Sequence, residues 1–338
     1  MIKIKDQSKI VQMPWPFSRR LRSPHGIFKV IESSLKVNLG IPRCLAALVV
    51  AVGITLLNPD PGGGTETRTV VDQMGRSVTF PVHPQRVISL APSITEIVFA
   101  IGRGECLKGA TIYSDYPEAA LALPKVGSYV HLDLEKIVAL KPDLCIAVKD
   151  GNPKETADRL VSLGISVYAV NPIDLDSVIS TVGLIGSLLN ADASAARVVN
   201  DMEQRIRRVE HLVSTAATRP RVFFQIGINP IVSVGNDTFI HELIERAGGI
   251  NLAAASVSYP RFSKEQFLAL SPDVVIITSM ARGEVFQKVK KEWQSWPDLP
   301  AVRNDQVHIV DSNILDRPTP RMVDGLELLV RLIHPELF

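Results

Sequence analysis

The sequence predicts an α/β protein built from two lobes that one long helix connects. Short β-type runs alternate with amphipathic helical stretches in both halves of the chain. Between the halves, residues 192–215 contain no Gly or Pro, and one segment of the first half recurs in the second. Because 46% of the 338 residues are apolar, the chain has enough core-forming material for about two domains.

The amino-terminal segment predicts export across the cytoplasmic membrane. Residues 44–57 form an uncharged apolar run of 14 residues, which follows a basic region and precedes a Gly/Pro linker. This order is typical of a signal peptide, either cleaved or kept as an uncleaved anchor in the inner membrane. Residues 1–65 hold nine Lys/Arg against three Asp/Glu, and the remainder holds 28 against 32. The basic charge therefore belongs to the tail, and the acidic body is a poor surface for nucleic acid.

Both halves of the body alternate expected strands with expected helices. In the first half the strands are expected at residues 87–90, 107–111, 144–148 and 167–170. The helices are expected at residues 93–101, 134–140 and 155–163. In the second half the strands are expected at residues 222–225, 231–234, 274–278 and 307–310. Strands that alternate with helices predict parallel sheets with helical layers.

The segment at residues 192–215 predicts the connecting helix. Asp192 is a candidate N-cap. Apolar residues then recur at helical spacing, at Ala196, Val199, Met202, Ile206, Val209 and Val213. We therefore expect limited motion between the lobes, since a single helix is a stiff connector. The expected domains are a leader (1–64), an amino-terminal α/β lobe (65–173), a helical connector (174–218) and a carboxyl-terminal α/β lobe (219–338).

An internal repeat supports the division into two lobes. LEKIVALKPDLCIAV (134–148) aligns without gaps to KEQFLALSPDVVIIT (264–278). Each copy indicates a helix, a Pro-Asp turn and a buried strand, because proline ends the helix and the apolar run suits a parallel strand covered on both faces. Cys145 lies in the first copy, where it is either a buried thiol or the disulfide partner of Cys106.

The sequence holds no recognisable catalytic or metal-binding constellation. Residues 102–107 carry only two glycines and lead into a strand, so no nucleotide-binding loop is indicated. No G-x-S-x-G motif is present, and His241-Glu242 lacks the second histidine of a zinc motif. The cysteines show no zinc-type spacing. We therefore expect a protein that is not an enzyme and has no metal.

Aromatic residues follow several of the expected strands. They are Tyr113, Tyr116, Tyr129 and Tyr259. Ligands of α/β lobes bind beyond the carboxyl ends of the strands. These tyrosines therefore favour a flat and largely apolar ligand in a cleft between the lobes.

Several segments together resemble a known family. They are RVISLAPSITEIVFAIG (86–102), YSDYP (113–117), LEKIVALKPDLCIA (134–147), GN (151–152), LVSLGI (160–165), RVFFQIGINP (221–230) and SYPRFSKEQFLALSPDVVIIT (258–278). In this order they are similar to the periplasmic substrate-binding proteins of cobalamin-type ABC importers, a group that includes haem and ferric-siderophore carriers. The resemblance implies two Rossmann-like α/β lobes joined by a rigid helix, a ligand cleft between them, and delivery to an ABC importer permease with its ATPase subunits.

The resemblance is greatest for the cobalamin-binding branch of this family, and it implies where the ligand binds. Tyr116 falls on an aromatic position that contacts the corrin, and Tyr129 and Tyr259 stand where that branch has tryptophans. Val148 and Ile226 depart from the pattern, because they replace a tryptophan and a phenylalanine.

In the carboxyl-terminal lobe, the resemblance implies two further ligand positions and one docking position. Asn313 takes the place of an aspartate, and Arg317 matches an arginine of the ligand-facing loop. Glu135 and Glu265 occupy the same place in the two repeat copies. The matching glutamates of the family dock into arginine pockets on the two permease subunits, so this pair is implied to contact the permease.

These observations predict a binding protein that captures cobalamin or a related corrinoid for vitamin uptake, with no cofactor of its own. Haem or a ferric siderophore is the alternative ligand. A catecholate siderophore needs several cationic groups, and the candidates are Lys149, Arg261, Arg317 and Arg321. An exported α/β enzyme or chelatase is the alternative from another class.

Overall fold

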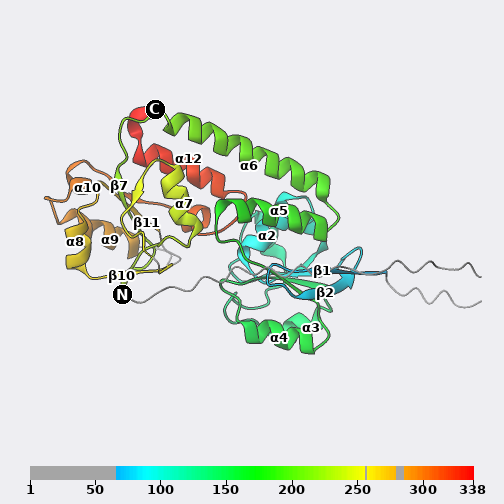
Figure 1. Cartoon of the computed structure of the whole chain (residues 1–338). Helices are drawn as coiled ribbons and strands as arrows, with labels where there is room; N and C mark the ends of the chain where they lie inside the picture. Colours follow the sequence, from blue (N-terminus) through cyan, green and yellow to red (C-terminus); the bar gives the residue numbers. More distant parts are fainter. Residues whose placement is uncertain (1–65, 256, 279–284) are drawn as a thin grey trace, which may run out of the picture. The chain divides into compact units, whose positions relative to one another are not determined.

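A computed structural model describes residues 66–255, 257–278 and 285–338 (Figure 1). Gly64–Phe338 forms one compact unit. The predicted export segment at residues 44–57 lies outside the described residues. In the part of the chain that is described, no helix has the length and apolar character needed to cross a membrane.

The amino-terminal lobe is built on a four-stranded parallel sheet with the order β4-β3-β5-β6. Its strands are β3 (Val87–Ser89), β4 (Leu107–Gly109), β5 (Leu144–Val148) and β6 (Val167–Val170). Its helices are α2 (Pro92–Ala100), α3 (Leu134–Ala139) and α4 (Lys154–Ser162). Every residue of β5 is buried, because its alternate side chains enter two different hydrophobic clusters on the two faces of the sheet. The strands and helices predicted for this half are confirmed, each to within two residues at either end.

An antiparallel hairpin that the sequence did not reveal precedes this sheet. Its strands are β1 (Thr67–Val71) and β2 (Ser77–Pro81). Asp72 closes the hairpin turn, because its carboxylate accepts hydrogen bonds from the backbone N–H groups of Met74 and Arg76. Val78 and Phe80 bury one face of β2 against the main core.

Two helices, α5 (Leu175–Leu188) and α6 (Asp192–Val213), connect the lobes, and α6 packs along α5 and α12 (Met322–Ile333) (Figure 1). Asp174 begins α5 with a capping box that includes Ser177. The prediction that Asp192 caps α6 was wrong. Ala191 is the N-cap, and Asp192 is the first helical residue, where its charge still favours the helix dipole.

The carboxyl-terminal lobe contains a second four-stranded parallel sheet, with the order β12-β11-β7-β9. Its strands are β7 (Arg221–Gln225), β9 (Ile250–Asn251), β11 (Val274–Ile277) and β12 (Val307–Ile309). Outside this sheet, β8 (Ile231–Val232) pairs with β10 (Arg261–Phe262). The further helices are α7 (Phe239–Arg246), α8 (Lys264–Leu270), α9 (Val285–Gln294), α10 (Pro300–Arg303) and α11 (Ser312–Leu315).

The internal repeat is visible as α3–β5 in one lobe and α8–β11 in the other, each placing its strand inside a parallel sheet. The residue before the proline is left-handed in both copies, with φ of 48° at Lys141 and 47° at Ser271. The aspartate after the proline then accepts a backbone hydrogen bond from the neighbouring strand: Asp143 from Arg86, and Asp273 from Arg221. The two lobes therefore use the same device to join helix, turn and strand.

One hydrophobic cluster extends through both lobes and the connecting helices. It includes Val87 of β3, Val182 of α5, Ile206 of α6 and Leu326 of α12. This shared core explains why residues 64–338 form a single compact unit.

Cys106 and Cys145 are both free and buried, so the disulfide alternative was wrong. They lie in different hydrophobic clusters, on opposite faces of the amino-terminal sheet. Burial raises the pKa of the Cys106 thiol to about 11 and that of Cys145 to about 12. Both thiols therefore stay protonated and serve as small core residues.

Candidate functional site

Three tyrosines lie on loops at the carboxyl-terminal edge of the first sheet. Tyr113 and Tyr116 follow β4, and Tyr129 lies in the loop before α3. The rings of Tyr113 and Tyr129 meet edge to face, with centroids 6.0 Å apart. Tyr113 and Tyr116 keep 44% and 46% of their surface exposed. Such a group of exposed rings offers contact area to a flat apolar ligand.

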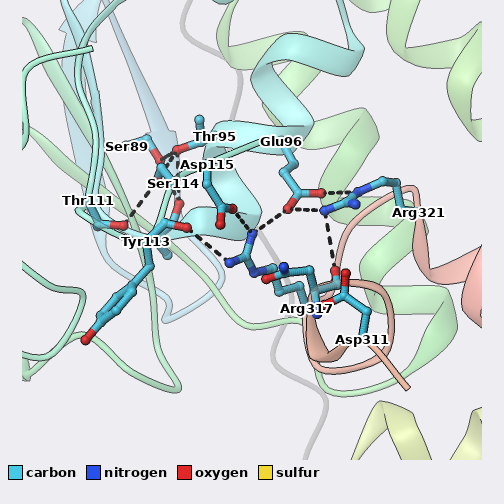
Figure 2. A network of polar contacts seen from close by, with 12 residues as sticks. Ser89, Thr95, Glu96, Thr111, Tyr113, Ser114, Asp115, Asp311, Arg317 and Arg321 are labelled. Atoms are coloured by element: carbon cyan, nitrogen blue, oxygen red, sulfur yellow. Dashed lines mark hydrogen bonds and ion pairs between the residues drawn. The ribbon is translucent and has the colours of Figure 1, made fainter. Parts of the chain in front are cut away.

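A chain of buried hydroxyl groups fixes the loop after β4. Ser114 Oγ lies 2.9 Å from Thr95 Oγ1 and 3.0 Å from Thr111 Oγ1, and Thr95 Oγ1 lies 2.8 Å from Ser89 Oγ (Figure 2). All four residues are buried. Because buried hydroxyl groups require hydrogen-bond partners, this chain ties the loop to β3 and α2 and places the adjacent Asp115.

Asn152 joins three loops at the same edge. Its Oδ1 accepts from the Val148 N–H at 2.8 Å, and its Nδ2 donates to the carbonyl oxygens of Leu90 and Tyr129 at 2.8 and 2.7 Å. Gly151 precedes it with φ of 129°, and a Cβ there would lie 2.9 Å from the Tyr129 ring. The Gly-Asn pair therefore positions Tyr129, with glycine required by both the backbone angle and the close ring.

Two arginines of the second lobe reach two carboxylates of the first (Figure 2). Glu96 of α2 accepts from Arg321 Nε and NH2, both at 2.8 Å, and from Arg317 NH1 at 3.0 Å. Arg317 NH1 also donates to Asp115 Oδ1 at 2.9 Å, and Arg317 NH2 donates to the Tyr113 carbonyl at 3.1 Å. The Glu96 side chain is only 2% exposed. Charge-assisted, bidentate bonds of this kind fix geometry strongly, so the cluster joins the two lobes at the tyrosine loops.

The remaining contacts of Arg321 continue this cluster toward the aromatic residues. Its guanidinium carbon lies 3.7 Å from the centroid of the Tyr116 ring, within cation–π range. Its NH2 group also lies 3.4 Å from the carbonyl oxygen of Asn313. Asn313, a ligand position that the resemblance implies, therefore faces Arg321 through its backbone carbonyl, and its N–H donates to Asp311 Oδ1.

Tyr259 forms a second bridge between the lobes. Its hydroxyl donates to Asp150 Oδ2 at 3.0 Å, and 43% of its surface is exposed. Burial of the hydroxyl and the nearby Asp150 carboxylate raise the pKa of Tyr259. Burial, Tyr113 and Asp150 likewise raise the pKa of Tyr129. Both phenols are therefore neutral hydrogen-bonding groups near pH 7.

Asp316 precedes Arg317 in the same loop. Its Oδ1 accepts from Thr278 Oγ1 at 2.9 Å. Burial raises the pKa of Asp316 to about 7, although the Thr278 hydrogen bond and Arg317 act in the opposite direction. A carboxyl group that changes charge near neutral pH is therefore the sequence neighbour of Arg317.

The two aliphatic positions implied by the resemblance lie at the ends of central strands. Val148 is the last residue of β5 and is 7% exposed. Ile226 follows β7, is half-buried and packs against the large hydrophobic cluster. Their side chains therefore contribute mainly to the hydrophobic core beneath the loops.

The paired glutamates are exposed in both lobes. Glu135 lies in the first turn of α3, which Asp133 caps, and Glu265 lies in the first turn of α8, which Ser263 caps. The Ser263 hydroxyl, followed by the backbone, lowers the pKa of Glu265. The two side chains therefore present carboxylates at equivalent places, as the repeat predicts.

Sequence reasoning missed Glu96, Asp115 and Asp150 as site residues. Glu96 reads as one polar residue inside an apolar helical segment, and its arginine partners lie more than 200 positions away. A carboxylate on the core side of an amphipathic helix was the available signal, because a buried charge requires a partner. Among the described residues, no group of three or more His, Cys, Asp or Glu side chains is placed to hold a metal ion.

Comparisons with known proteins agree with this architecture. The family model described as periplasmic binding protein matches residues 87–314. A vitamin B12-binding protein of Vibrio cholerae is 34% identical over 252 residues, which are 73% of this chain and 88% of the relative. A substrate-binding lipoprotein of an uncharacterized ABC transporter from Bacillus subtilis is 28% identical over 277 residues, covering 80% of this chain and 86% of the relative.

Solved structures share the two-lobed fold. The periplasmic vitamin B12-binding protein of Vibrio cholerae superposes with a TM-score of 0.66 at 32% identity, over 75% of this chain and 98% of that one. A periplasmic haem-binding protein from Pseudomonas aeruginosa superposes with a TM-score of 0.69 at 28% identity, over 75% and 93%. The matched family, the two parallel α/β lobes and the long linking helix together show that the chain belongs to the periplasmic binding proteins that serve ABC importers.

Proposed function

We propose that the protein captures a corrinoid outside the cytoplasmic membrane and delivers it to the permease of an ABC importer. The observation that carries this proposal is the group of exposed tyrosines at the contact between the lobes. Tyr113 and Tyr116 contribute from the first lobe, and Tyr259 contributes from the second. The 34% identity to a vitamin B12-binding protein supports a corrinoid as the ligand.

Capture requires shape, aromatic contact and hydrogen bonds, with no covalent step. The Tyr259 hydroxyl donates its proton to Asp150 and can still accept a hydrogen bond, which suits the amide N–H groups at the rim of a corrin ring. The exposed rings provide contact area for a flat macrocycle. The relatives that carry the similarity are binding proteins, which supports a function without catalysis.

Delivery is proposed to use Glu135 and Glu265. Both carboxylates are exposed and occupy matching helix starts in the two lobes. Two equivalent charges on two similar lobes suit a permease built from two similar subunits. Such charges direct and align the encounter more than they add affinity.

Haem is the second candidate ligand. Two observations favour it: the presence of several tyrosines, which can bind ferric iron, and the similarity to haem-binding structures at 26% and 28% identity. Haem differs from a corrinoid because it brings two ring carboxylates and an iron that needs an axial ligand.

Absorption titration of the purified protein distinguishes these ligands. We expect saturable binding of cyanocobalamin and of cobinamide at one molecule per protein, because the site has one set of loops from each lobe. Haemin should bind more weakly, without the spectral change of a phenolate-bound iron. Binding of haemin with such a change, and no binding of either corrinoid, would assign the protein to haem instead.

A further inference from the structure

The two arginines between the lobes are already paired with the carboxylates of Glu96 and Asp115. Arg321 uses Nε and NH2 on Glu96, and Arg317 uses NH1 on Glu96 and Asp115 and NH2 on the Tyr113 carbonyl (Figure 2). Two guanidinium groups are thus matched by two carboxylates. Without those carboxylates, the same arginines would form a fork suited to carboxylate or phosphate.

Neighbouring groups add negative charge to this cluster. Asp311 lies beside the two arginines (Figure 2), and Asp150 accepts from the Tyr259 hydroxyl. Lys125 directs its ammonium group to the carbonyl oxygens of Ser114 and Ala120, both at 2.9 Å. Burial lowers the pKa of Lys125, and the charge of Asp115 acts in the opposite direction, so Asp115 offsets this positive charge as well. A ligand carboxylate placed here would therefore meet a neutral or negative environment.

The two carboxylates of the cluster differ in their roles. Glu96 is buried and holds both arginines, so it fixes the lobes against each other. Asp115 accepts a hydrogen bond from Arg317 NH1 at 2.9 Å, and its side chain is 23% exposed. Without the charge of Asp115, more of the positive charge of Arg317 would be available to a ligand. Glu96 would still hold both arginines in position.

We propose that Asp115 determines ligand class at this site: by neutralising Arg317, it favours a macrocycle with uncharged amide groups over one with carboxylates. This inference rests on the proposed function, because it assumes that the ligand binds at the tyrosine loops. Asp115 acts on the ligand through Arg317 and is therefore a positioning and charge-balancing residue.

The test is the variant Asp115→Asn in the full chain, titrated with haemin and with cyanocobalamin. Asparagine keeps the Oδ1 acceptor for Arg317 and removes only the charge. We expect the affinity for haemin to rise about tenfold or more, and the gain to shrink as salt is raised, because one released positive charge attracts a propionate. The affinity for haemin should therefore rise relative to the affinity for cyanocobalamin, which presents amide groups in place of carboxylates.

Asp158→Asn is the matched control, because it removes one carboxylate from the exposed surface of α4, outside the cluster. It should leave both affinities unchanged. If the wild-type protein binds cyanocobalamin and Asp115→Asn leaves haemin affinity unchanged, the role of Asp115 is overturned and the proposed function stands. If the wild-type protein does not bind cyanocobalamin, the proposed function fails, and this inference fails with it.

Discussion

The two lobes share the same helix–turn–strand unit, but they supply different charged groups at the contact between them. In both, a capped helix leads through a left-handed residue and a Pro-Asp turn into a buried parallel strand. At the contact between the lobes, the first lobe supplies the carboxylates Glu96, Asp115 and Asp150, whereas the second supplies Arg317 and Arg321. The scaffold is therefore repeated, whereas the loops carry complementary charges. Mutations in the scaffold should affect the stability of both lobes equally, and mutations at the contact should not.

The strongest effect is expected at the two exposed glutamates that occupy equivalent positions in the lobes. Charge reversal of both repeat positions, Glu135→Arg with Glu265→Arg, should abolish uptake or stimulation of the transporter's ATPase. The physical reason is repulsion between the new arginines and the basic pockets proposed on the permease. Ligand binding in solution should stay the same, as absorption titration would show.

A matched double variant is available in Glu155→Arg with Glu203→Arg, which changes the same charge on α4 and α6. It should support normal uptake at equal expression. Normal uptake by the Glu135 and Glu265 variant would leave those residues with only their helix-dipole role, about 0.3–1 kcal/mol each.

The next effect compares the two arginines of the second lobe. Arg321→Ala removes two hydrogen bonds from a carboxylate that is 2% exposed, so we expect the free energy of unfolding to fall by about 3 kcal/mol. Arg317→Ala should lower it by less, roughly 1 kcal/mol, because Arg321 still pairs with Glu96. Urea unfolding measures both values, and equal losses would contradict the different roles of the two arginines.

The stability of the second lobe should depend on pH through Asp316. The pKa of about 7 lies above that of the unfolded chain, so ionisation of Asp316 destabilises the folded state as pH rises from about 4 to 7. Asp316→Asn should therefore be more stable than wild type at pH 8, by up to about 4 kcal/mol, and nearly equal to it at pH 4. Thermal or urea unfolding at the two pH values measures this, with Asp298→Asn as an exposed control. If the stability difference between variant and wild type were the same at both pH values, the pKa of Asp316 would not be raised in the folded protein.

The smallest effect is expected at the left-handed residues of the repeated unit. Lys141→Gly and Ser271→Gly should each raise the free energy of unfolding by about 0.5–1 kcal/mol, because both residues have positive φ and glycine adopts that conformation without steric cost. The two gains should agree within about 0.5 kcal/mol and should add in the double variant. A gain in one lobe with a loss in the other would show that the repeat is only superficial.

The sequence predicted the scaffold better than the site for a physical reason. Strand β5 and the repeat are encoded by apolar runs and a Pro-Asp turn within about 15 residues, a range over which sequence patterns are informative. The hairpin β1–β2 was not predicted, because its first strand is short and half exposed and gives little hydrophobic signal. The exposed tyrosines could be found because aromatic residues are unusual in polar loops.

The charged cluster could not be predicted in the same way. Glu96 and Arg321 are separated by 225 positions, and nothing local in either segment identifies the other as its partner. Their pairing depends on how the connecting helices set one lobe against the other, which is decided by the shared core.

The proposed function requires that one ligand contacts both lobes at once, and calorimetric titration of cyanocobalamin measures whether it does. Tyr129→Ala removes a ring from the first lobe and Tyr259→Ala removes one from the second. We predict a single site, weakened by about 1–3 kcal/mol in each variant, with melting temperatures close to that of wild type. Unchanged affinity in either variant, together with a lowered melting temperature, would show that this tyrosine only packs within the protein, and would contradict a site shared between the lobes.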